Sequence, residues 1–147
     1  GFAVGEYLKN NEKEIFDTLV RVPLKFRDMD YTQESHRGFH APAISLTKDG
    51  DFHDIRFSIA TMDVLDCRPD LMEKVYKAHR RFGKLLHDEK FQINFRLGPG
   101  DIYSFNNRRI LHGRTAFDPN SGHRHLQGYY MDRDEIIGRL NFLKKNS

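Results

Sequence analysis

The sequence predicts a mainly β protein with packing helices, an α+β jelly-roll, and three observations support this fold class. Short segments of alternating apolar and polar residues recur along the chain. Gly, Pro, Asn and Asp separate these segments, as they do between the strands of a jelly-roll. Helical periodicity is confined to a few segments that would pack on the sheets. With 147 residues and no linker, we expect one domain over residues 1–147.

Composition narrows the class of protein further. The chain is 38% hydrophobic and 31% charged, as in globular proteins, and no apolar run is long enough to span a membrane. Lys and Arg are scattered and the formal charge is only +3, so neither nucleic acid nor a membrane is an expected partner. The single Cys67 excludes an internal disulfide and, with no signal peptide, predicts a cytoplasmic location.

The first half of the chain reads as one helix followed by short strands. Leu8, Ile15 and Phe16 favour an amphipathic helix over residues 5–19. Strands are expected at 18–26, 40–47 and 55–59, with a loop at 27–39 and an Asp-Gly turn at 48–51.

The second half repeats this alternation. The spacing of its apolar residues predicts a helix from Pro69 to Leu85, and Asp132 and Glu135 indicate the start of a last helix. The buried face of that last helix would consist of Ile136, Leu140 and Leu143. Between the two helices, strands are expected at 91–97, 101–105, 105–114 and 122–130.

The last two predicted strands form a hairpin that organises the candidate site. Asp118-Pro119-Asn120-Ser121-Gly122 has turn chemistry, so the strands fold back antiparallel and Arg124 lies near His112. A neutral imidazole can bind a divalent metal, and a guanidinium can hold a carboxylate through two parallel hydrogen bonds. The same two residues also occur on hairpins that bind nothing, so spacing alone leaves both interpretations open.

The sequence motifs of this region resemble those of a known family. FNNRRILHGR, then AFDP, then RHLQGYY and DRDE with a later RL, are similar to the C-terminal part of the γ-butyrobetaine dioxygenase (γ-butyrobetaine hydroxylase) family. That family belongs to the Fe(II)- and 2-oxoglutarate-dependent oxygenases, and trimethyllysine and taurine dioxygenases are its relatives. The resemblance is dense over residues 91–143 and looser back to Gly1. It implies a double-stranded β-helix core, incomplete at the N-terminus because the chain begins with Gly1 and not Met.

The resemblance also implies an iron site. These enzymes bind Fe(II) through a His-x-Asp or His-x-Glu motif and a later histidine, and leave positions open for 2-oxoglutarate and O₂. His112 matches the late histidine, while the early motif is expected upstream of Gly1. His87-Asp88-Glu89 fits the His-x-Glu pattern of the early motif. It lies too close to His112 in the sequence, so we interpret it as the polar end of a helix.

Three further residues match positions that bind ligands in the family. Arg124 matches the residue that holds the distal carboxylate of 2-oxoglutarate, and Tyr130 matches an aromatic that contacts a trimethylammonium group. Ser58 stands where the family has an asparagine that contacts the substrate carboxylate, and is a shorter donor. Tyr130 could instead be a packing residue.

The function implied is hydroxylation of γ-butyrobetaine, a trimethylammonium acid, to L-carnitine. Fe(II), 2-oxoglutarate and O₂ would be required, ascorbate would serve as reductant, and a homodimer is possible. The alternatives are a trimethyllysine- or taurine-type oxygenase and a jelly-roll binding module without a metal triad. Since only one of three metal ligands is visible, residues 1–147 alone are expected to be inactive.

Overall fold

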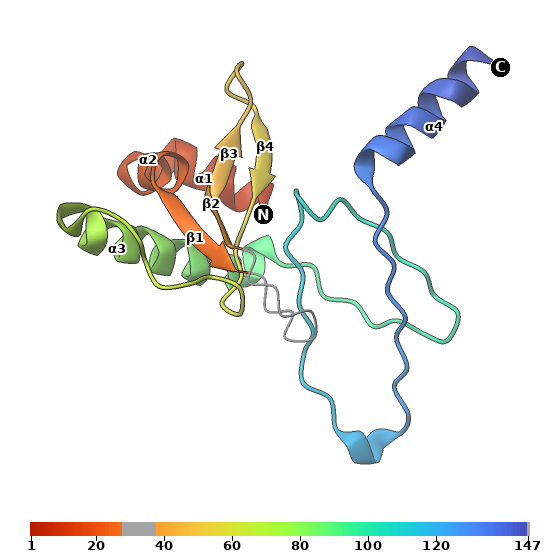
Figure 1. The fold of residues 1–147 in the computed structure, drawn as a ribbon. Helices are drawn as coiled ribbons and strands as arrows, with labels where there is room; N and C mark the ends of the chain where they lie inside the picture. Colours follow the sequence, from red (N-terminus) through yellow and green to blue (C-terminus); the bar gives the residue numbers. More distant parts are fainter. Residues whose placement is uncertain (28–37, 147) are drawn as a thin grey trace. The chain divides into compact units, whose positions relative to one another are not determined.

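A computed structural model describes residues 1–27 and 38–146, so most of the predicted loop at 27–39 lies outside the described residues. Within that part, the chain combines helices with small antiparallel sheets (Figure 1). It divides into a first unit, Gly1–Gly113, and a second unit, Arg114–Ser147, each of which is described by itself. The elements in order are α1 Phe2–Asn11, α2 Lys13–Arg21, β1 Pro23–Arg27, β2 Gly38–Pro42, β3 Ile44–Leu46, β4 Phe52–Ile55, α3 Pro69–Leu86, the 3₁₀ helices Glu89–Phe91 and Pro119–Ser121, and α4 Arg133–Lys145.

The single helix predicted over residues 5–19 is two helices with a corner at Glu12. Glu12 has φ −138° and ψ 62°, outside the helical region. The Asn11 side-chain amide donates to the Tyr7 carbonyl oxygen (2.8 Å), which is the local competition that makes asparagine a poor helix former. At the corner, the Glu12 carboxylate accepts bonds from Arg81 Nε of α3 at 2.8 and 3.0 Å, and these bonds lower the pKa of Glu12.

Two separate two-stranded antiparallel sheets follow. β1 pairs with β2 from Pro23↔Pro42 to Arg27↔Gly38, and β3 pairs with β4 from Ile44↔Ile55. The predicted strand at 18–26 starts later because α2 extends to Arg21, and the strand predicted at 40–47 divides between β2 and β3. The predicted turn at 48–51 is confirmed, with Gly50 at φ +85°.

The strand predicted at 55–59 was placed too late. β4 ends at Ile55, and the chain then turns at Ser58, whose carbonyl oxygen accepts from the Met62 amide (3.1 Å). The Ser58 hydroxyl also accepts from the Thr61 amide (3.2 Å). Serine side chains offer the backbone this alternative to a strand ladder, which the alternation of Ile55, Phe57 and Ile59 does not reveal.

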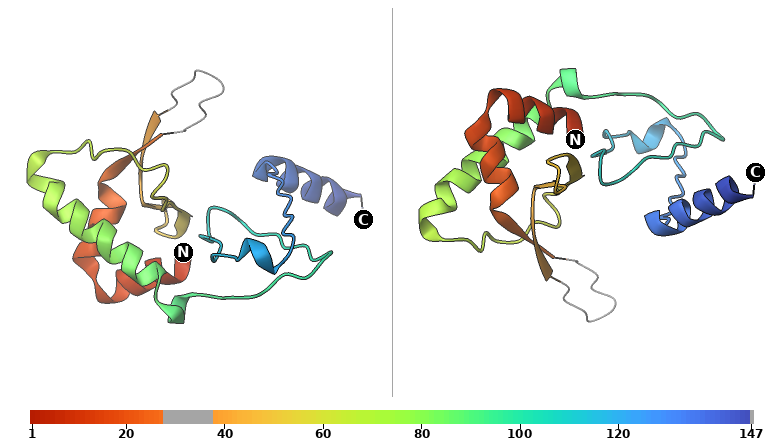
Figure 2. Two further views of the ribbon diagram at one scale, coloured as in Figure 1. Left: turned by 90° about the horizontal axis from the view of Figure 1, so that it is seen from below. Right: turned by 90° about the horizontal axis from the view of Figure 1, so that it is seen from above.

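The core of the first unit lies where three helices meet the sheets. α2 packs on α3, and it also contacts β2 and β3, as the two further views of Figure 2 show for the helices. The predicted apolar stripe of α3 is confirmed, and its largest side chain, Phe82, is fully buried. The buried apolar side chains are Val4, Leu8, Phe16, Leu19, Leu24, Phe26, Ala43, Ile44, Ile55, Leu65, Val75, Ala78, Phe82 and Leu85.

The strands predicted at 91–97, 101–105, 105–114 and 122–130 are not formed within the described residues. Regular structure between residues 92 and 131 is limited there to the 3₁₀ helix Pro119–Ser121. Ile93 and Ile102 remain 88% and 94% exposed. An extended segment becomes a strand only when a neighbour pairs with its backbone groups, and the described residues supply no such neighbour here. The predicted jelly-roll is therefore not seen in this part of the chain.

The second unit contains α4, which begins after Asp132 as predicted. The Asp132 side chain makes no capping bond, although its position before the helix and Glu135 three residues later are typical of one. The predicted buried face is also wrong: Ile136, Leu140 and Leu143 are 48–50% exposed, because the described part of this unit holds no second layer. No helix in the described ranges is long and apolar enough to cross a membrane.

Candidate functional site

The segment that carries His112 is fixed to the first unit by a backbone turn. The amides of Arg109 and Ile110 donate to the Asn106 carbonyl oxygen (3.0 and 3.1 Å), and the Asn106 side chain accepts from the Arg108 amide (3.0 Å). The Ile55 amide of β4 donates to the Arg108 carbonyl oxygen (2.9 Å), and the Phe2 amide of α1 donates to that of Arg109 (3.3 Å). The turn is therefore placed by α1 and β4, although it was predicted as part of a strand.

Past this turn, His112 presents an exposed imidazole. Leu111 is half-buried against the core, so the backbone is held on one side of the histidine. The ring of Phe105 lies 4.6 Å from the imidazole, centroid to centroid, with the planes tilted by 60°. Neither ring nitrogen of His112 is hydrogen-bonded to another described residue. Its chemistry thus fits that of one imidazole ligand for a divalent metal.

The described residues do not complete a metal site by themselves. No group of three or more His, Cys, Asp or Glu side chains gathers among them. The interpretation of His87-Asp88-Glu89 as a helix end is confirmed. His87 caps α3 with Nδ1 2.8 Å from the Gly83 carbonyl oxygen, and the Asp88 carboxylate accepts from the Lys90 amide (3.1 Å).

Ser58 lies in the first unit, in the turn that follows β4. Its hydroxyl oxygen accepts from Thr61, which leaves the O–H group able to donate to a carboxylate and one lone pair able to accept. No hydrogen bond or ring contact joins Ser58 to His112 within the described part of the chain. Its role in substrate binding stays a prediction.

Sequence reasoning did not single out a charged network on β4. Asp54 is 3% exposed and forms an ion pair with Arg56, whose Nη1 donates to the Ser45 hydroxyl (3.3 Å). A buried carboxylate requires such a partner. The sequence does place two opposite charges, Asp54 and Arg56, on either side of Ile55, which could have indicated an ion pair. The Ile55 amide is the one that donates to the turn before His112.

Arg124 and Tyr130 belong to the second unit. The Arg124 guanidinium lies over the Phe117 ring, 5.4 Å from its centroid, and Tyr130 is 88% exposed. The predicted turn between residues 118 and 122 is confirmed: the Asp118 carboxylate accepts from the Asn120 amide (2.9 Å), and Gly122 has φ +128°. The predicted antiparallel pairing that would set Arg124 opposite His112 stays a prediction.

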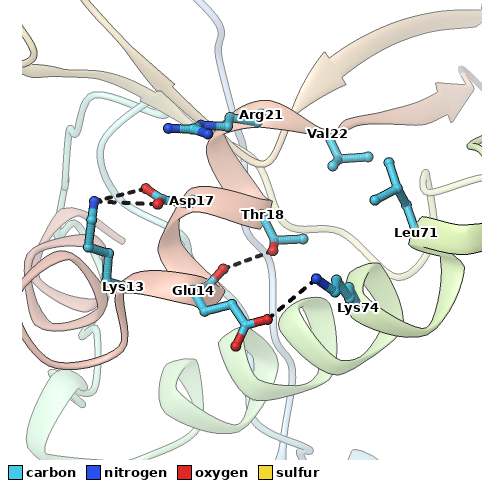
Figure 3. A pocket seen from close by; sticks show the side chains of 8 residues that line it. All are labelled: Lys13, Glu14, Asp17, Thr18, Arg21, Val22, Leu71 and Lys74. Atoms are coloured by element: carbon cyan, nitrogen blue, oxygen red, sulfur yellow. Dashed lines mark hydrogen bonds and ion pairs between the residues drawn. The ribbon is translucent and has the colours of Figure 1, made fainter.

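A groove between α2 and α3 contains none of these predicted site residues (Figure 3). Its walls carry two exposed ion pairs, Lys13–Asp17 (3.4 Å) and Lys74–Glu14 (3.7 Å). Val22 and Leu71 form its apolar part. Four of the charged side chains in this groove are paired with each other, and among the described residues the Arg21 guanidinium, which also lines it, has no ion-pair partner.

Comparisons with known proteins agree with the family resemblance of the sequence. Residues 1–130 match the family described as "Taurine catabolism dioxygenase TauD, TfdA family". The chain is 36% identical over 145 residues to a gamma-butyrobetaine dioxygenase of Pseudomonas sp. (strain AK-1), covering 99% of this chain and 37% of the relative. Identity to the human gamma-butyrobetaine dioxygenase is 32% over 149 residues, covering 99% of this chain and 38% of the relative.

A second group of relatives carries another name. The chain is 28% identical over 145 residues to a trimethyllysine dioxygenase of Meyerozyma guilliermondii, covering 97% of this chain and 36% of the relative. The chain thus spans less than two fifths of the length of these curated relatives.

Proposed function

Because this chain belongs to the TauD/TfdA dioxygenase family, we propose that it forms the C-terminal part of the catalytic domain of an Fe(II)- and 2-oxoglutarate-dependent oxygenase. The observation that carries the proposal is the position of His112 and Arg124 inside the range that matches the family. His112 would bind the iron, with the other two ligands supplied by a His-x-Asp or His-x-Glu motif elsewhere in the full-length protein. Bound iron would supply the oxidising chemistry, and this chain's residues would hold and orient what reacts.

Arg124 would hold the distal carboxylate of 2-oxoglutarate. A guanidinium matches a carboxylate with two parallel hydrogen bonds, and the contact with the Phe117 ring, 5.4 Å away, would limit its rotation. Phe117 would therefore orient the fork before the cosubstrate arrives. Tyr130, which on a strand would share a face with Arg124, would contact the trimethylammonium group of the substrate.

The substrate we propose is γ-butyrobetaine, converted to L-carnitine. Identity to relatives named gamma-butyrobetaine dioxygenase, 36% and 32%, exceeds the 28% to the trimethyllysine dioxygenase above. A trimethyllysine-type substrate is the second candidate, because Ser58 is a weaker partner for a butyrobetaine carboxylate than the asparagine expected there.

We further propose that residues 91–114 and 122–130 join a double-stranded β-helix in the full-length protein. Their alternating apolar residues include Ile93 and Ile102, which are 88% and 94% exposed here, and a strand buries such residues against a neighbouring layer. A requirement for ascorbate, a homodimer, a cytoplasmic location, and the exclusion of nucleic acid and membrane as partners stay predictions.

The test of the cosubstrate role is turnover by the full-length protein, measured as Fe(II)-dependent succinate formation with γ-butyrobetaine. Arg124→Ala is expected to raise the KM for 2-oxoglutarate about 30-fold to several thousand-fold, since truncating one side of a buried charge pair costs about 2–5 kcal/mol. Arg124→Lys should recover only part of this loss, because an ammonium lacks the planar fork.

Arg139 provides the matched control, because its guanidinium also lies over a ring, that of Phe142, at 5.2 Å. Arg139→Ala should leave the KM for 2-oxoglutarate unchanged. A normal KM in Arg124→Ala would reject the cosubstrate role. Absence of any 2-oxoglutarate turnover in the wild-type protein, across a panel of trimethylammonium acids and taurine, would favour a binding module.

The test of the substrate class is Tyr130→Leu, paired with Tyr129→Leu at the neighbouring exposed ring. Loss of one cation–π partner at Tyr130 should weaken γ-butyrobetaine binding by about 0.5–2 kcal/mol and leave 2-oxoglutarate affinity unchanged. Tyr130→Phe should have a smaller effect because the ring remains. A neutral tert-butyl analogue of the substrate separates the two roles of the ring: equal weakening of both ligands would make Tyr130 a packing residue.

A further inference from the structure

Three aromatic rings form a row that ends on His112. Phe95 meets Tyr103 edge to face at 6.1 Å, Tyr103 stacks on Phe105 at 5.5 Å with the planes 10° apart, and Phe105 contacts His112 at 4.6 Å. All four residues lie in the first unit. Phe105 is half-buried, whereas the imidazole is exposed. The Phe105 ring that contacts His112 is thus itself packed against the Tyr103 ring.

The backbone turn and this ring restrict different motions of His112. The bonds from Ile55 and Phe2 fix the peptide backbone of the turn, but they leave the imidazole free to rotate about its two side-chain torsions. A histidine that binds a metal usually has its ring oriented by a hydrogen bond to the second nitrogen. Within the described residues, His112 has no such bond, and the contact with Phe105 limits its rotation instead.

We propose that Phe105, backed by Tyr103, is a positioning residue for His112, and that it holds the imidazole in the orientation in which it binds a divalent metal. The inference rests on the proposed function, in which His112 is a metal ligand. Ligand geometry must be held to within about 10–20° for a functional site, so a supported ring on one side of the imidazole has a direct effect on metal affinity.

A second phenylalanine–histidine contact in the first unit serves as a control, because its histidine is not a proposed metal ligand. Phe57, also half-buried, stacks on His79 at 4.8 Å with the planes 16° apart. His79 is partly buried, and desolvation lowers the pKa of its imidazole. Phe57 also packs edge to face on Phe82 of the core, at 5.6 Å. Phe57 therefore serves packing, and its truncation should affect stability without affecting a metal site.

The experiment uses the full-length protein without iron and Co(II) as the probe, titrated without oxygen and followed by its visible d–d absorption bands. Phe105→Ala and Phe105→Leu are expected to weaken Co(II) binding about 10–100-fold and to change the intensity of the bands, as loss of an orienting neighbour does. Phe105→Tyr should restore both, because it keeps the ring, whereas leucine keeps only apolar volume. Phe57→Ala should leave both unchanged while lowering the Tm.

The possible outcomes distinguish failure of the positioning role of Phe105 from failure of the proposed metal-binding role of His112. Wild-type affinity and bands in Phe105→Leu would overturn the positioning role, as would an equal loss of affinity in Phe57→Ala. If Phe105→Ala does not fold, Phe105→Leu and Tyr103→Ala decide, and the proposal requires a loss of affinity in both. If His112→Ala binds Co(II) as the wild type does, the proposed metal ligand itself is wrong, whatever Phe105 does.

Discussion

Each of the two units of this chain contains a helix with several apolar residues, and the two helices bury these residues to different extents. In the first unit, α3 buries Val75, Ala78 and Phe82 against other elements. In the second, α4 carries Leu140, Phe142 and Leu143, all 49–56% exposed. Apolar residues at helical spacing therefore indicate that a helix can pack on a partner surface. Whether the helix is buried depends on the elements around it.

The candidate site residues follow the same division. His112 is held by backbone bonds from α1 and β4 and by the ring of Phe105. The Arg124 guanidinium has a ring contact seven residues away, at Phe117, and Tyr130 is almost fully exposed. Backbone bonds from α1 and β4, which are distant in sequence, hold the turn before His112, whereas the ring contacts of His112 and Arg124 each come from a residue seven positions away.

The largest expected contrast is between Phe82→Ala in α3 and Phe142→Ala in α4. Phe82 is fully buried, so its truncation should lower the free energy of unfolding by about 3–5 kcal/mol through lost transfer energy and a cavity. Phe142 is 56% exposed, and its truncation should change that free energy by less than about 0.5 kcal/mol. Urea denaturation followed by circular dichroism measures both.

This pair also tests whether α4 acquires a partner in the full-length protein. Measured on residues 1–147, the two variants should differ as stated. If Phe142→Ala in the full-length protein costs as much as Phe82→Ala does, then α4 is buried there and the contrast applies to residues 1–147 alone. Equal costs on residues 1–147 would contradict the description of α4 given above.

A smaller contrast comes from two glycines in helices. A Cβ at Gly5 of α1 would lie 2.6 Å from Cε1 of Phe52, a ring packed between Phe2 and Phe16. Gly5→Ala should therefore destabilise the first unit by about 1–3 kcal/mol through overpacking. A Cβ at Gly138 of α4 would meet nothing within 4 Å. Gly138→Ala should stabilise α4 by about 0.5–1 kcal/mol through helix propensity alone.

The measurement for Gly5→Ala is again urea denaturation. For Gly138→Ala it is amide hydrogen exchange in α4, which should slow by about two- to fivefold, the factor that corresponds to 0.5–1 kcal/mol. A gain of stability in Gly5→Ala would show that the Phe52 ring moves aside at little cost. Unchanged exchange in Gly138→Ala would show that α4 is already held by a partner.

Local signals in the sequence were sufficient for part of this fold. The stripe of α3, the turn at Gly50 and the turn from Asp118 to Gly122 were all predicted from neighbouring residues, and all three are present. Each depends on interactions within a few positions, such as the Asp118 carboxylate and the Asn120 amide. Membership of the TauD/TfdA family was likewise reached from the order of short motifs.

The strands were predicted less well for a physical reason. The alternation at Ile93 and Phe95 predicts which face of a strand would be buried. It does not identify the neighbouring strand whose backbone must supply the hydrogen bonds. The site shows a related limit: His112 was found from a motif, whereas Phe105 and the Asp54–Arg56 pair were not, because the sequence does not show that the Phe105 ring faces the imidazole or that Asp54 is buried.

The turn at Asn106–Arg109 has a consequence for the order in which this chain folds. Its bonds join it to Phe2, nearly the whole length of the first unit away in sequence, and to Ile55 of β4. Closing so long a loop is entropically costly until the distant partners are already in place. The turn therefore docks after α1 and β4 have formed, and a chain still emerging from the ribosome exposes His112 in no fixed geometry. If His112 binds iron as proposed, its part of the metal site is completed only at the end of folding.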